Sequence, residues 1–514
     1  MDLQNAALVT ASSVLMFTAL KQLLRTGELK GGAAVHKSTL TSVTSMMENQ
    51  KYPAKRHNLN VKKCLLEKNP QLKATNTAIF ISGAKLEGIK YCDQNKAFRQ
   101  NRYFYYLSGC NIPASSLLFN FNTEELTLFL PDVDKENIMW SGLPLSIDEA
   151  YERYDVDSVA YASSIQKNLV GLDDFQLLTI DLDDVPSNIQ PLLKIGGDDL
   201  FYALDECRMI KDEYELAMLR KACAITDKCH LSVMSAIPIE HNEGHMHAEF
   251  TYHAMRQGSK FQGYDPICCS GPNCGTLHYV KNDDGMEGKH SVLLDAGAEW
   301  ENYTADVTRC FPINGTWTKE HREIYETVLD MQTQVMNRIK PGVSWDELHV
   351  LAHRVLIAHF LKLGIFKSEY TAEELLSSRA SVAFFPHGLG HLLGMDTHDV
   401  GGNPNYDDPD PMMKYLRLRR PLKAGMVVTN EPGCYFNQFL IEEFLEKHPD
   451  KLKLVNRDVM SKYFYIGGVR IEDDVLVTET GYENLTKVTS DPNEIEKIVS
   501  AAIKKGRSHF HALA

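Results

Sequence analysis

The sequence has few of the features that mark several large classes of protein. Its 514 residues contain only eleven cysteines, and no two of them have the CxxC spacing of a structural zinc site. So few cysteines exclude a disulfide scaffold, and an odd number favours free thiols in a reducing compartment. The chain also lacks internal repeats and low-complexity tracts. An ordinary apolar core must therefore stabilise it.

Positive charge is scarce as well. The chain has 54 Lys and Arg residues against 68 Asp and Glu residues, which gives a formal net charge of −14 at pH 7. The phosphates of a nucleic acid would be repelled unless a strong basic patch were present. The basic clusters around Lys21 and Arg417 are too short to supply one. We therefore expect no nucleic-acid partner.

The N-terminus lacks a long apolar run. Residues 3–20 carry no charge, but the apolar part, 6–20, contains hydroxyl residues and is shorter than the ~20 residues that span a bilayer. Residues 1–25 fit an unstructured amphipathic leader, a weak organelle-targeting segment or a marginal anchor. We expect a cytoplasmic protein without stable membrane insertion, with targeting or anchoring by residues 1–25 as the open alternatives.

Pattern changes along the chain predict four parts. Residues 1–50 form a leader and a linker rich in Gly, Ser and Thr, 51–205 an α/β domain, 206–490 a second folded domain and 491–514 a C-terminal tail. In the first domain, a helical stretch follows Lys51, and short apolar runs between turn residues predict strands. These runs are Thr77–Ile81, Ser116–Phe121 and Leu126–Leu130.

The second half has clear helix signals. Glu213–Ala236 has apolar residues at helical spacing and acids in its first turn. Thr318 and Ser344 are placed to cap two further helices, which we expect to stop at Lys340 and Gly364. Strands are predicted at Ser291–Leu294, Met426–Thr429 and Val469–Ile471.

Two carboxylates mark the ends of neighbouring strands in this half. Asp295 follows the first strand, and Asp306 lies eleven residues further on, beyond a turn near Glu299–Asn302. A hairpin would bring both carboxylates side by side, which is costly unless a proton or a cation lies between them. Either acid alone is more often an ordinary turn residue.

Three more contexts join histidines, carboxylates and glycines. Pro386-His387-Gly388-Leu389-Gly390-His391 is followed by His398, and three histidines in twelve residues are an unusual concentration. An apolar strand runs directly into Glu431, where Pro432 ends it. Strand alternation places Arg470 and Glu472 on one face, where the cation can orient the carboxylate.

Four carboxylates and one histidine suit a pair of hard or borderline divalent cations such as Mn²⁺, Co²⁺ or Zn²⁺. Paired cations polarise a carbonyl and so favour hydrolysis, and a nearby carboxylate can carry a proton to the leaving group. The residues alone therefore predict a dinuclear metallohydrolase, and a peptidase and a phosphoesterase both remain open.

The same residues carry a family resemblance. Asp295, Asp306, His391, Glu431 and Glu472, in the contexts LLDAG, YTADVTR, PHGLGH, NEPG and RIEDD, resemble the Xaa-Pro peptidases, the aminopeptidase P and prolidase family. The stretch from Tyr91 to Gly109 resembles the N-terminal domain of these enzymes, and the whole looks most like a fungal Xaa-Pro aminopeptidase. The resemblance implies an α+β fold, with an N-terminal α/β domain followed by a pita-bread catalytic domain.

The resemblance also implies roles for single residues. Asp306 and Glu472 would lie between two metal ions, expected to be Mn²⁺, with Asp295 on one and His391 on the other. Glu431 would be a ligand and a proton shuttle. The implied substrate-side residues are His278, His387 and His398, with Arg470 beside the metals and Tyr264 and Arg417 near the substrate.

Three functions follow from the resemblance. The first is an aminopeptidase that removes the residue preceding proline from the N-terminus of a peptide. The second is an Xaa-Pro dipeptidase of the prolidase type, which a carboxylate-reading Arg417 would favour. The third, a non-catalytic binding protein, is disfavoured because all five predicted ligands are present. Proline-containing peptides are the expected partners, and a homo-oligomer is possible.

Overall fold

The computed structural model describes residues 50–169, 172 and 174–505. The predicted leader, apart from Gln50, lies outside the described residues, and so do the targeting and anchoring alternatives for residues 1–25. Over the described ranges, no helix combines the length and the apolar character that crossing a membrane requires.

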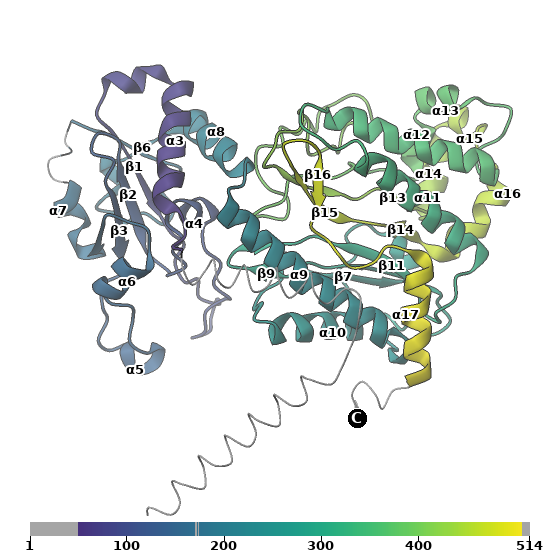
Figure 1. The fold of residues 1–514 in the computed structure, drawn as a ribbon, viewed down its shortest axis with the longest axis horizontal. Coiled ribbons are helices and arrows are strands. Elements are labelled where there is room, and N and C mark those ends of the chain that lie inside the picture. The colour runs from purple at the N-terminus through teal and green to yellow at the C-terminus, as the bar shows by residue number, and fades with distance from the viewer. Residues whose placement is uncertain (1–49, 170–171, 173, 506–514) are drawn as a thin grey trace, which may run out of the picture. The chain divides into compact units, whose positions relative to one another are not determined.

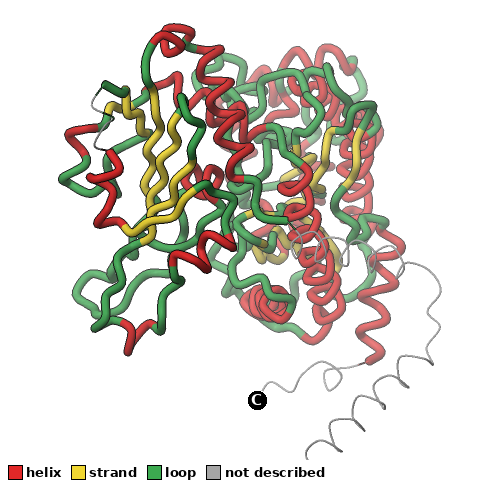
Figure 2. The backbone as a smooth tube through the Cα atoms, turned by 60° about the vertical axis from the view of Figure 1, so that its left-hand side comes forward, coloured by secondary structure: helices red, strands yellow, loops and turns green. Residues whose placement is uncertain are grey.

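A six-stranded mixed sheet forms the N-terminal part (Figures 1 and 2). Its order is β4-β3-β2-β1-β5-β6; β1, β2 and β3 pair antiparallel, whereas β4, β5 and β6 join in parallel. The strands are β1 (Thr77–Ser82), β2 (Ser116–Asn120), β3 (Leu126–Leu130), β4 (Ser158–Tyr161), β5 (Gln176–Thr179) and β6 (Lys194–Ile195). The three strands predicted from apolar runs are therefore confirmed, each from its first residue.

Helices flank this sheet, with α7 on one side of the strands and α3 and α8 on the other in Figure 1. Alternate β1 residues, Ala78 and Phe80, share a buried cluster with Ile165 and Leu169 of α7. Asn101 caps α4 by accepting hydrogen bonds from two backbone amides. The helices are α3 (Ala54–Lys68), α4 (Arg102–Ser108), α5 (Ile138–Ser141), α6 (Ile147–Arg153), α7 (Ile165–Leu169) and α8 (Gly197–Met209). Helix α8 runs through the predicted domain boundary at 205/206, and that boundary remains a prediction.

Long helices dominate the second part. Helix α9 (Glu213–Ala236) has the predicted bounds, and Asp212 caps it in a reciprocal pair with Glu215. Thr318 caps α11 as predicted, whereas Ser344 occupies the cap position of α12 without a side-chain cap bond. These helices are α9, α10 (Glu243–Arg256), α11 (Lys319–Met336) and α12 (Trp345–Leu363).

Short antiparallel sheets lie among these helices. One has the order β11-β8-β7 and another β12-β15-β16, while β13 pairs with β14 and β9 with β10. A β-bridge between Thr308 and Glu472 joins β11 to the residue that directly precedes β15. The strands are β7 (Ile267–Ser270), β8 (Ser291–Asp295), β9 (Glu299–Trp300), β10 (Tyr303–Thr304), β11 (Thr308–Pro312), β12 (Val427–Asn430), β13 (Gly433–Tyr435), β14 (Gly468–Arg470), β15 (Asp473–Val477) and β16 (Tyr482–Asn484).

The C-terminal segment packs against this part. Residues 492–505 of the predicted tail form helix α17, and Ile495 and Val499 lie fully buried in the same apolar core as α9 and α11. This stretch is therefore part of the folded body. The remaining helices are α13 (Ala372–Ser378), α14 (Gln438–Lys447), α15 (Pro449–Leu452), α16 (Arg457–Met460) and α17 (Pro492–Lys505). Together these elements confirm the predicted α+β class with an N-terminal α/β domain.

Candidate active site

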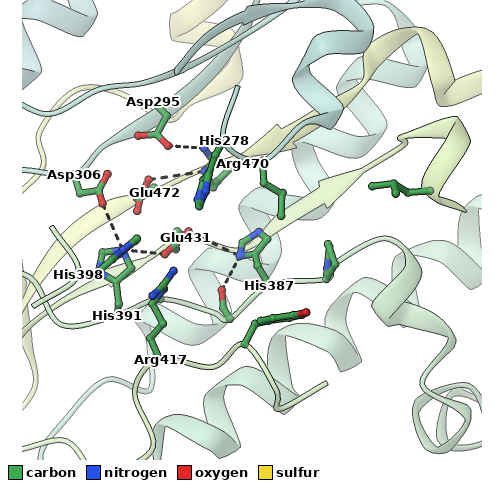
Figure 3. A pocket seen from close by; sticks show the side chains of 16 residues that line it. His278, Asp295, Asp306, His387, His391, His398, Arg417, Glu431, Arg470 and Glu472 are labelled. Carbon is green, nitrogen blue, oxygen red and sulfur yellow. Dashed lines mark hydrogen bonds and ion pairs between the residues drawn. The ribbon is translucent and has the colours of Figure 1, made fainter. Parts of the chain in front are cut away.

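A cavity of about 410 Å³ opens in the second part of the molecule, and ten of the eleven predicted site residues line it (Figure 3). The exception is Tyr264, which lies behind the cavity wall and donates a hydrogen bond to Asp295. The lining residues among the predictions are His278, Asp295, Asp306, His387, His391, His398, Arg417, Glu431, Arg470 and Glu472.

The predicted hairpin brings Asp295 and Asp306 to the same wall. Strand β8 pairs with β11 so that Asp295 lies opposite Thr308, and β9 and β10 form the connecting hairpin. Its turn residue Asn302 has a φ of 65°, in the left-handed region that turns use. Gly297 is required here, because a Cβ at this position would lie 1.7 Å from the Ala305 carbonyl oxygen.

Within the cavity, a group of potential ligand atoms belongs to Asp306, His391 and Glu472. These three buried side chains offer atoms that all lie within 4.8 Å of one another. His391 Nε2 is 3.4 Å from Asp306 Oδ2 and 3.3 Å from Glu431 Oε1. Asp295 is not part of this group but adjoins Asp306, and its Oδ2 accepts a hydrogen bond from Arg470 at 2.5 Å. The structure thus brings four of the five predicted ligands into one cluster, with Asp295 beside it.

The histidine loop packs directly on strand β12. A Cβ on Gly390 would lie 2.1 Å from the Thr429 carbonyl oxygen, so only glycine allows this approach. The backbones of His391 and Thr429 are hydrogen-bonded, and the Thr429 hydroxyl accepts from the His391 amide at 3.0 Å. The same hydroxyl donates to Glu431 at 3.2 Å. Thr429 therefore fixes His391 and Glu431 relative to each other.

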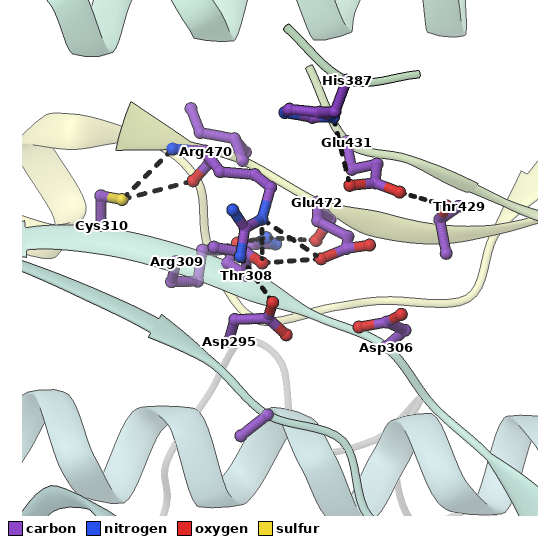
Figure 4. Close-up of polar contacts among 12 residues, drawn as sticks. Asp295, Asp306, Thr308, Arg309, Cys310, His387, Thr429, Glu431, Arg470 and Glu472 are labelled. Atoms are coloured by element: carbon purple, nitrogen blue, oxygen red, sulfur yellow. Dashed lines mark hydrogen bonds and ion pairs between the residues drawn. The ribbon is translucent and has the colours of Figure 1, made fainter. Parts of the chain in front are cut away.

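Arg470 is the hub of the polar contacts around the carboxylates (Figure 4). Besides Asp295, it donates to Thr308 Oγ1 at 3.0 Å and to Tyr435 Oη at 2.9 Å. Thr308 in turn donates to Glu472 Oε2 at 2.6 Å. Arg470 itself lies 3.9 Å from Glu472 Oε2. Arg470 and Glu472 thus lie close together although Glu472 follows the end of β14, and the arginine contacts Asp295 more closely than Glu472.

Burial and like charge dominate the electrostatics of the cluster. Burial and the neighbouring Asp295 charge raise the pKa of Asp306 well above its usual range. Burial, followed by the charges of Asp306 and Glu431, does the same to the pKa of Glu472. Burial raises the pKa of Glu431 to about 7, although the neighbouring His391 opposes this shift. The cluster therefore favours binding positive charge, as protons or as cations.

His387 differs from the other histidines in its hydrogen bonding. Its Nδ1 lies 2.7 Å from the Gly388 carbonyl oxygen, an acceptor, and its Nε2 lies 2.9 Å from Tyr435 Oη. Burial and the Arg470 charge lower the pKa of His387 to about 3, so the ring has one proton, which belongs on Nδ1. Tyr435 accepts from Arg470 and donates to Nε2. Both ring nitrogens of His387 are therefore already occupied.

His278 and His398 keep their ring nitrogens available. Among the described residues, no protein group is hydrogen-bonded to either ring, and burial lowers the pKa of both side chains. The His398 ring packs edge-on against His391 at a centroid distance of 4.5 Å. Arg417 donates to Tyr406 at 3.2 Å, and within the described ranges no carboxylate lies within 4 Å of its guanidinium. These three side chains are free to meet a bound molecule.

Residues from the N-terminal part brace the site. Arg99 and Arg102 both bind Glu299, in the hairpin that joins Asp295 to Asp306. Buried Arg208 of α8 binds Asp396 at 2.7 Å and Asp399 at 2.8 Å, the two acids that flank His398.

Sequence reasoning missed the supporting residues Thr308, Thr429 and Tyr435. Thr308 and Thr429 lie within two residues of a predicted ligand in contexts already singled out, which is a usable signal. Tyr435 carries no local signal, because only the pairing of β13 with β14 brings it to Arg470.

A second histidine–carboxylate group lies far from the cavity in sequence and was also missed. His57, Asp212 and Glu215 offer ligand atoms within 4.8 Å of one another. His57 Nε2 lies 2.9 Å from Asp212 Oδ2, and its Nδ1 lies 2.7 Å from the Tyr106 carbonyl. Tyr303 donates to Glu215 at 3.0 Å, and Asp212 also accepts from Arg56. The protein itself therefore satisfies this group.

Comparison with known families matches both parts of the chain. Residues 217–479 match metallopeptidase family M24, and residues 52–173 match the N-terminal domain of aminopeptidase P. The catalytic match contains every predicted site residue. It confirms the predicted catalytic fold and identifies the chain as an enzyme of the metallopeptidase class.

Individual relatives agree with the family match. An uncharacterized peptidase of Saccharomyces cerevisiae is 61% identical over 94% of this chain and 91% of its own length. A probable Xaa-Pro aminopeptidase of Tuber melanosporum is 46% identical over 88% of this chain and 97% of its own. The structure of Escherichia coli aminopeptidase P with the inhibitor Pro-Leu superposes with a TM-score of 0.69 at 31% identity, covering 86% of this chain and 99% of that one.

Proposed function

The chain belongs to metallopeptidase family M24, and on that premise we propose that it is an aminopeptidase acting on peptides with proline in the second position. It releases the N-terminal residue by hydrolysing the bond before proline. The observation that carries this proposal is the cluster of Asp306, His391 and Glu472, within 4.8 Å of one another on the wall of a cavity that also holds Glu431.

The donor set fits two divalent cations. Carboxylate oxygens and one imidazole suit Mn²⁺, Co²⁺ or Zn²⁺, and we propose Mn²⁺. Buried carboxylates raise one another's pKa values because their charges repel. A bound cation would offset this repulsion, so the same carboxylates are suitable ligands. In this proposal Asp306 and Glu472 would be shared by the two ions, Asp295 would hold one of them, and His391 and Glu431 would complete the set.

The bound cations would polarise the scissile carbonyl and supply an activated nucleophile. Glu431 takes up the proton of the attacking water and passes it to the proline nitrogen as the peptide bond breaks. Without bound cations, burial raises the pKa of Glu431 to about 7; bound cations would lower this pKa and so favour the ionised form that can accept a proton. Thr429 holds Glu431 in the orientation that this transfer needs.

The histidines divide the remaining tasks. His278 and His398 have free ring nitrogens, so they can hydrogen-bond the substrate and stabilise charge that develops on the carbonyl oxygen. His387 has none to offer, because Gly388 and Tyr435 occupy both of them. Its ring instead forms a fixed wall of the cavity, suited to packing against the proline ring. Tyr264 and Arg470 act through Asp295, whose two oxygens they hold.

An Xaa-Pro dipeptidase is the second candidate, and one observation favours it. Arg417 lines the cavity and, among the described residues, has no carboxylate partner, so it can bind the carboxylate of a C-terminal proline. Such a contact would restrict the enzyme to dipeptides. If Arg417 instead bound the proline carbonyl oxygen of a longer peptide, the enzyme would not be restricted in this way.

The length of the peptide substrate separates the two candidates. We expect the Mn²⁺-loaded full chain to release alanine from Ala-Pro-Gly-Gly, but not from the control peptide Ala-Ala-Gly-Gly. Turnover confined to the dipeptide Ala-Pro would replace our proposal with the dipeptidase. Absence of hydrolysis from all of these peptides would support a non-catalytic protein. Metal analysis of the same preparation identifies the ion.

The remaining predictions concern the partners, the cellular location and the oligomeric state of the enzyme. We propose proline-containing peptides as its partners, no nucleic acid, and a cytoplasmic location. The net charge of −14 supports the absence of a nucleic-acid partner. The possibility of a homo-oligomer is tested directly by sedimentation of the purified full chain.

A further inference from the structure

An open groove of about 420 Å³ lies next to the active-site cavity, and it equals the cavity in size. Helix α14, the turn before α14 and the segment before His387 form most of its walls. We call it the apolar groove. Its lining residues are Gly275, Thr276, Leu277, Val382, Ala383, Pro386, Tyr435, Asn437, Leu440, Ile441, Glu443, Phe444, Lys447 and His448.

The apolar groove is continuous with the cavity. Leu277, Pro386 and Leu440 line both. Leu277 directly precedes His278, and Pro386 directly precedes His387. The groove therefore begins at the side of the cavity where the substrate-side histidines lie, and none of the proposed metal ligands lines it.

The walls of the groove are apolar and its charges are internally paired. Ile441, Tyr435 and Val382 are buried, and Phe444 packs partly against the core. The two oppositely charged lining residues, Glu443 and Lys447, bind each other at 2.6 Å. An aliphatic or aromatic side chain entering here would lose water on both surfaces without separating an ion pair.

An aminopeptidase substrate needs a path away from the scissile bond on one side only. On the N-terminal side of the scissile bond the peptide has only one residue. On the other side, the residues after proline must continue out of the cavity. Leu440 stands at the junction of cavity and groove and is 56% exposed, so this path leads to the surface. A closed pocket for the released residue would not need such an opening.

We propose that the apolar groove binds the residue that follows proline, and that it selects an aliphatic or aromatic side chain at this position. This inference rests on the proposed aminopeptidase function and adds a preference at the third residue of the peptide. The preference comes from helix α14 and its neighbours and requires no further contact with the metal site.

The experiment compares third residues in otherwise identical peptides. With the Mn²⁺-loaded full chain, we expect kcat/KM for Ala-Pro-Phe and Ala-Pro-Leu to exceed that for Ala-Pro-Gly by about tenfold, because each buried methylene group contributes to binding. Ala-Pro-Asp should be poorer than Ala-Pro-Gly, since its carboxylate would lose water in an apolar site.

Two variants locate the preference in the groove. Phe444→Ala removes a groove wall that does not line the cavity and should reduce the Phe-to-Gly preference about fivefold or more. Leu440→Glu places a carboxylate at the exposed junction and should make Ala-Pro-Lys a better substrate than Ala-Pro-Leu, a reversal that misfolding does not produce. Phe439→Ala is the matched control, because Phe439 lies on the same helix, is 74% exposed and lines neither space.

Two outcomes would overturn the inference, and they are distinguishable. Equal kcat/KM for every third residue, unchanged in both variants, rejects the groove as a binding site and leaves the proposed function intact. Cleavage of Ala-Pro alone rejects the aminopeptidase and the groove together.

Discussion

Two groups in this molecule combine a histidine with carboxylates at the same close spacing, yet they differ in how their polar atoms are satisfied. In the cavity, Asp306, His391 and Glu472 face one another, and burial and like charge raise the pKa of both acids. In the second group, Asp212 caps a helix, Glu215 accepts from Tyr303, and His57 lies between two acceptors. Burial also raises the pKa of Glu215, but the pKa values of Asp306 and Glu472 lie well above their usual range, so the cavity group has the stronger demand for positive charge.

The difference shows that proximity of ligand atoms does not by itself indicate a metal. In the second group, burial opposes the charge on His57, but Asp212 and Glu215 outweigh it and raise the His57 pKa. Burial likewise opposes the charge on Asp212, but His57 lowers the Asp212 pKa to about 2. A protonated histidine thus takes the place that a cation would occupy. In the cavity group, the charge of Arg470 lowers the pKa of Asp306 but does not outweigh burial and the Asp295 charge, so this pKa stays raised.

The largest expected effect comes from a cavity carboxylate. Asp306→Asn removes one charge from the cluster and should abolish metal binding at the proposed bridging position. We expect kcat/KM to fall on the order of a thousandfold or more, beyond the 10- to 100-fold that supporting residues cost. Metal content and peptide hydrolysis measure this.

The fold should survive this change. Removing a carboxylate relieves repulsion in the metal-free protein, so the circular dichroism spectrum and the thermal midpoint without metal should match those of the wild type or exceed them. If Asp306→Asn had wild-type turnover, Asp306 would not be a metal ligand. The cavity group would then not differ from the His57 group in binding metal.

An intermediate effect is expected from the second group. Asp212→Ala removes the cap of α9 and leaves His57 without its carboxylate, so the free energy of unfolding should fall by about 2 kcal/mol. Urea titration measures the loss. Ser146→Ala, the cap of the exposed helix α6, is the matched control and should cost about 1 kcal/mol or less.

Activity distinguishes the two groups further. Metal content and turnover per folded Asp212→Ala molecule should stay at wild-type values. Loss of bound metal from this variant would mean that the second group is itself a metal site.

The smallest effect concerns pH. His57 has a folded-state pKa above its unfolded value, so its stabilising contribution is complete below about pH 6.5 and is lost as the pH rises through the folded value. The thermal midpoint of His57→Gln should therefore lie below that of the wild type at pH 6, and the gap should narrow by pH 9. A gap that widens with pH would show that His57 is neutral in the folded protein.

Local sequence signals predicted much of the fold. The apolar spacing and the acids of the first turn gave both ends of α9, and Thr318 marked the start of α11. The predicted turn at Glu299–Asn302 brought Asp306, two residues before β11, close to Asp295 at the end of the paired strand β8. Each of these predictions depends on residues that are close together in the chain, where backbone preferences and periodicity are informative.

The remainder depends on residues that meet only after folding. Tyr435 reaches Arg470 through the pairing of β13 and β14, and His57 meets Asp212 across 155 residues of sequence. The sequence also does not show that the ring nitrogens of His278 are free whereas those of His387 have hydrogen-bonding partners. The apolar residues of α17 pack on a core that distant segments of the chain form. The sequence alone does not reveal that core, so it predicts a tail for these residues.

The contacts of Glu299 limit how the molecule can be divided. Arg99 and Arg102 reach this hairpin from the first part of the chain, and Tyr52 reaches Tyr303, in the same hairpin. A catalytic fragment cut at residue 206 would keep every proposed ligand but lose all three of these supports. We therefore expect such a fragment to keep the proposed metal ligands but to hold the hairpin between Asp295 and Asp306 less rigidly than the full chain does.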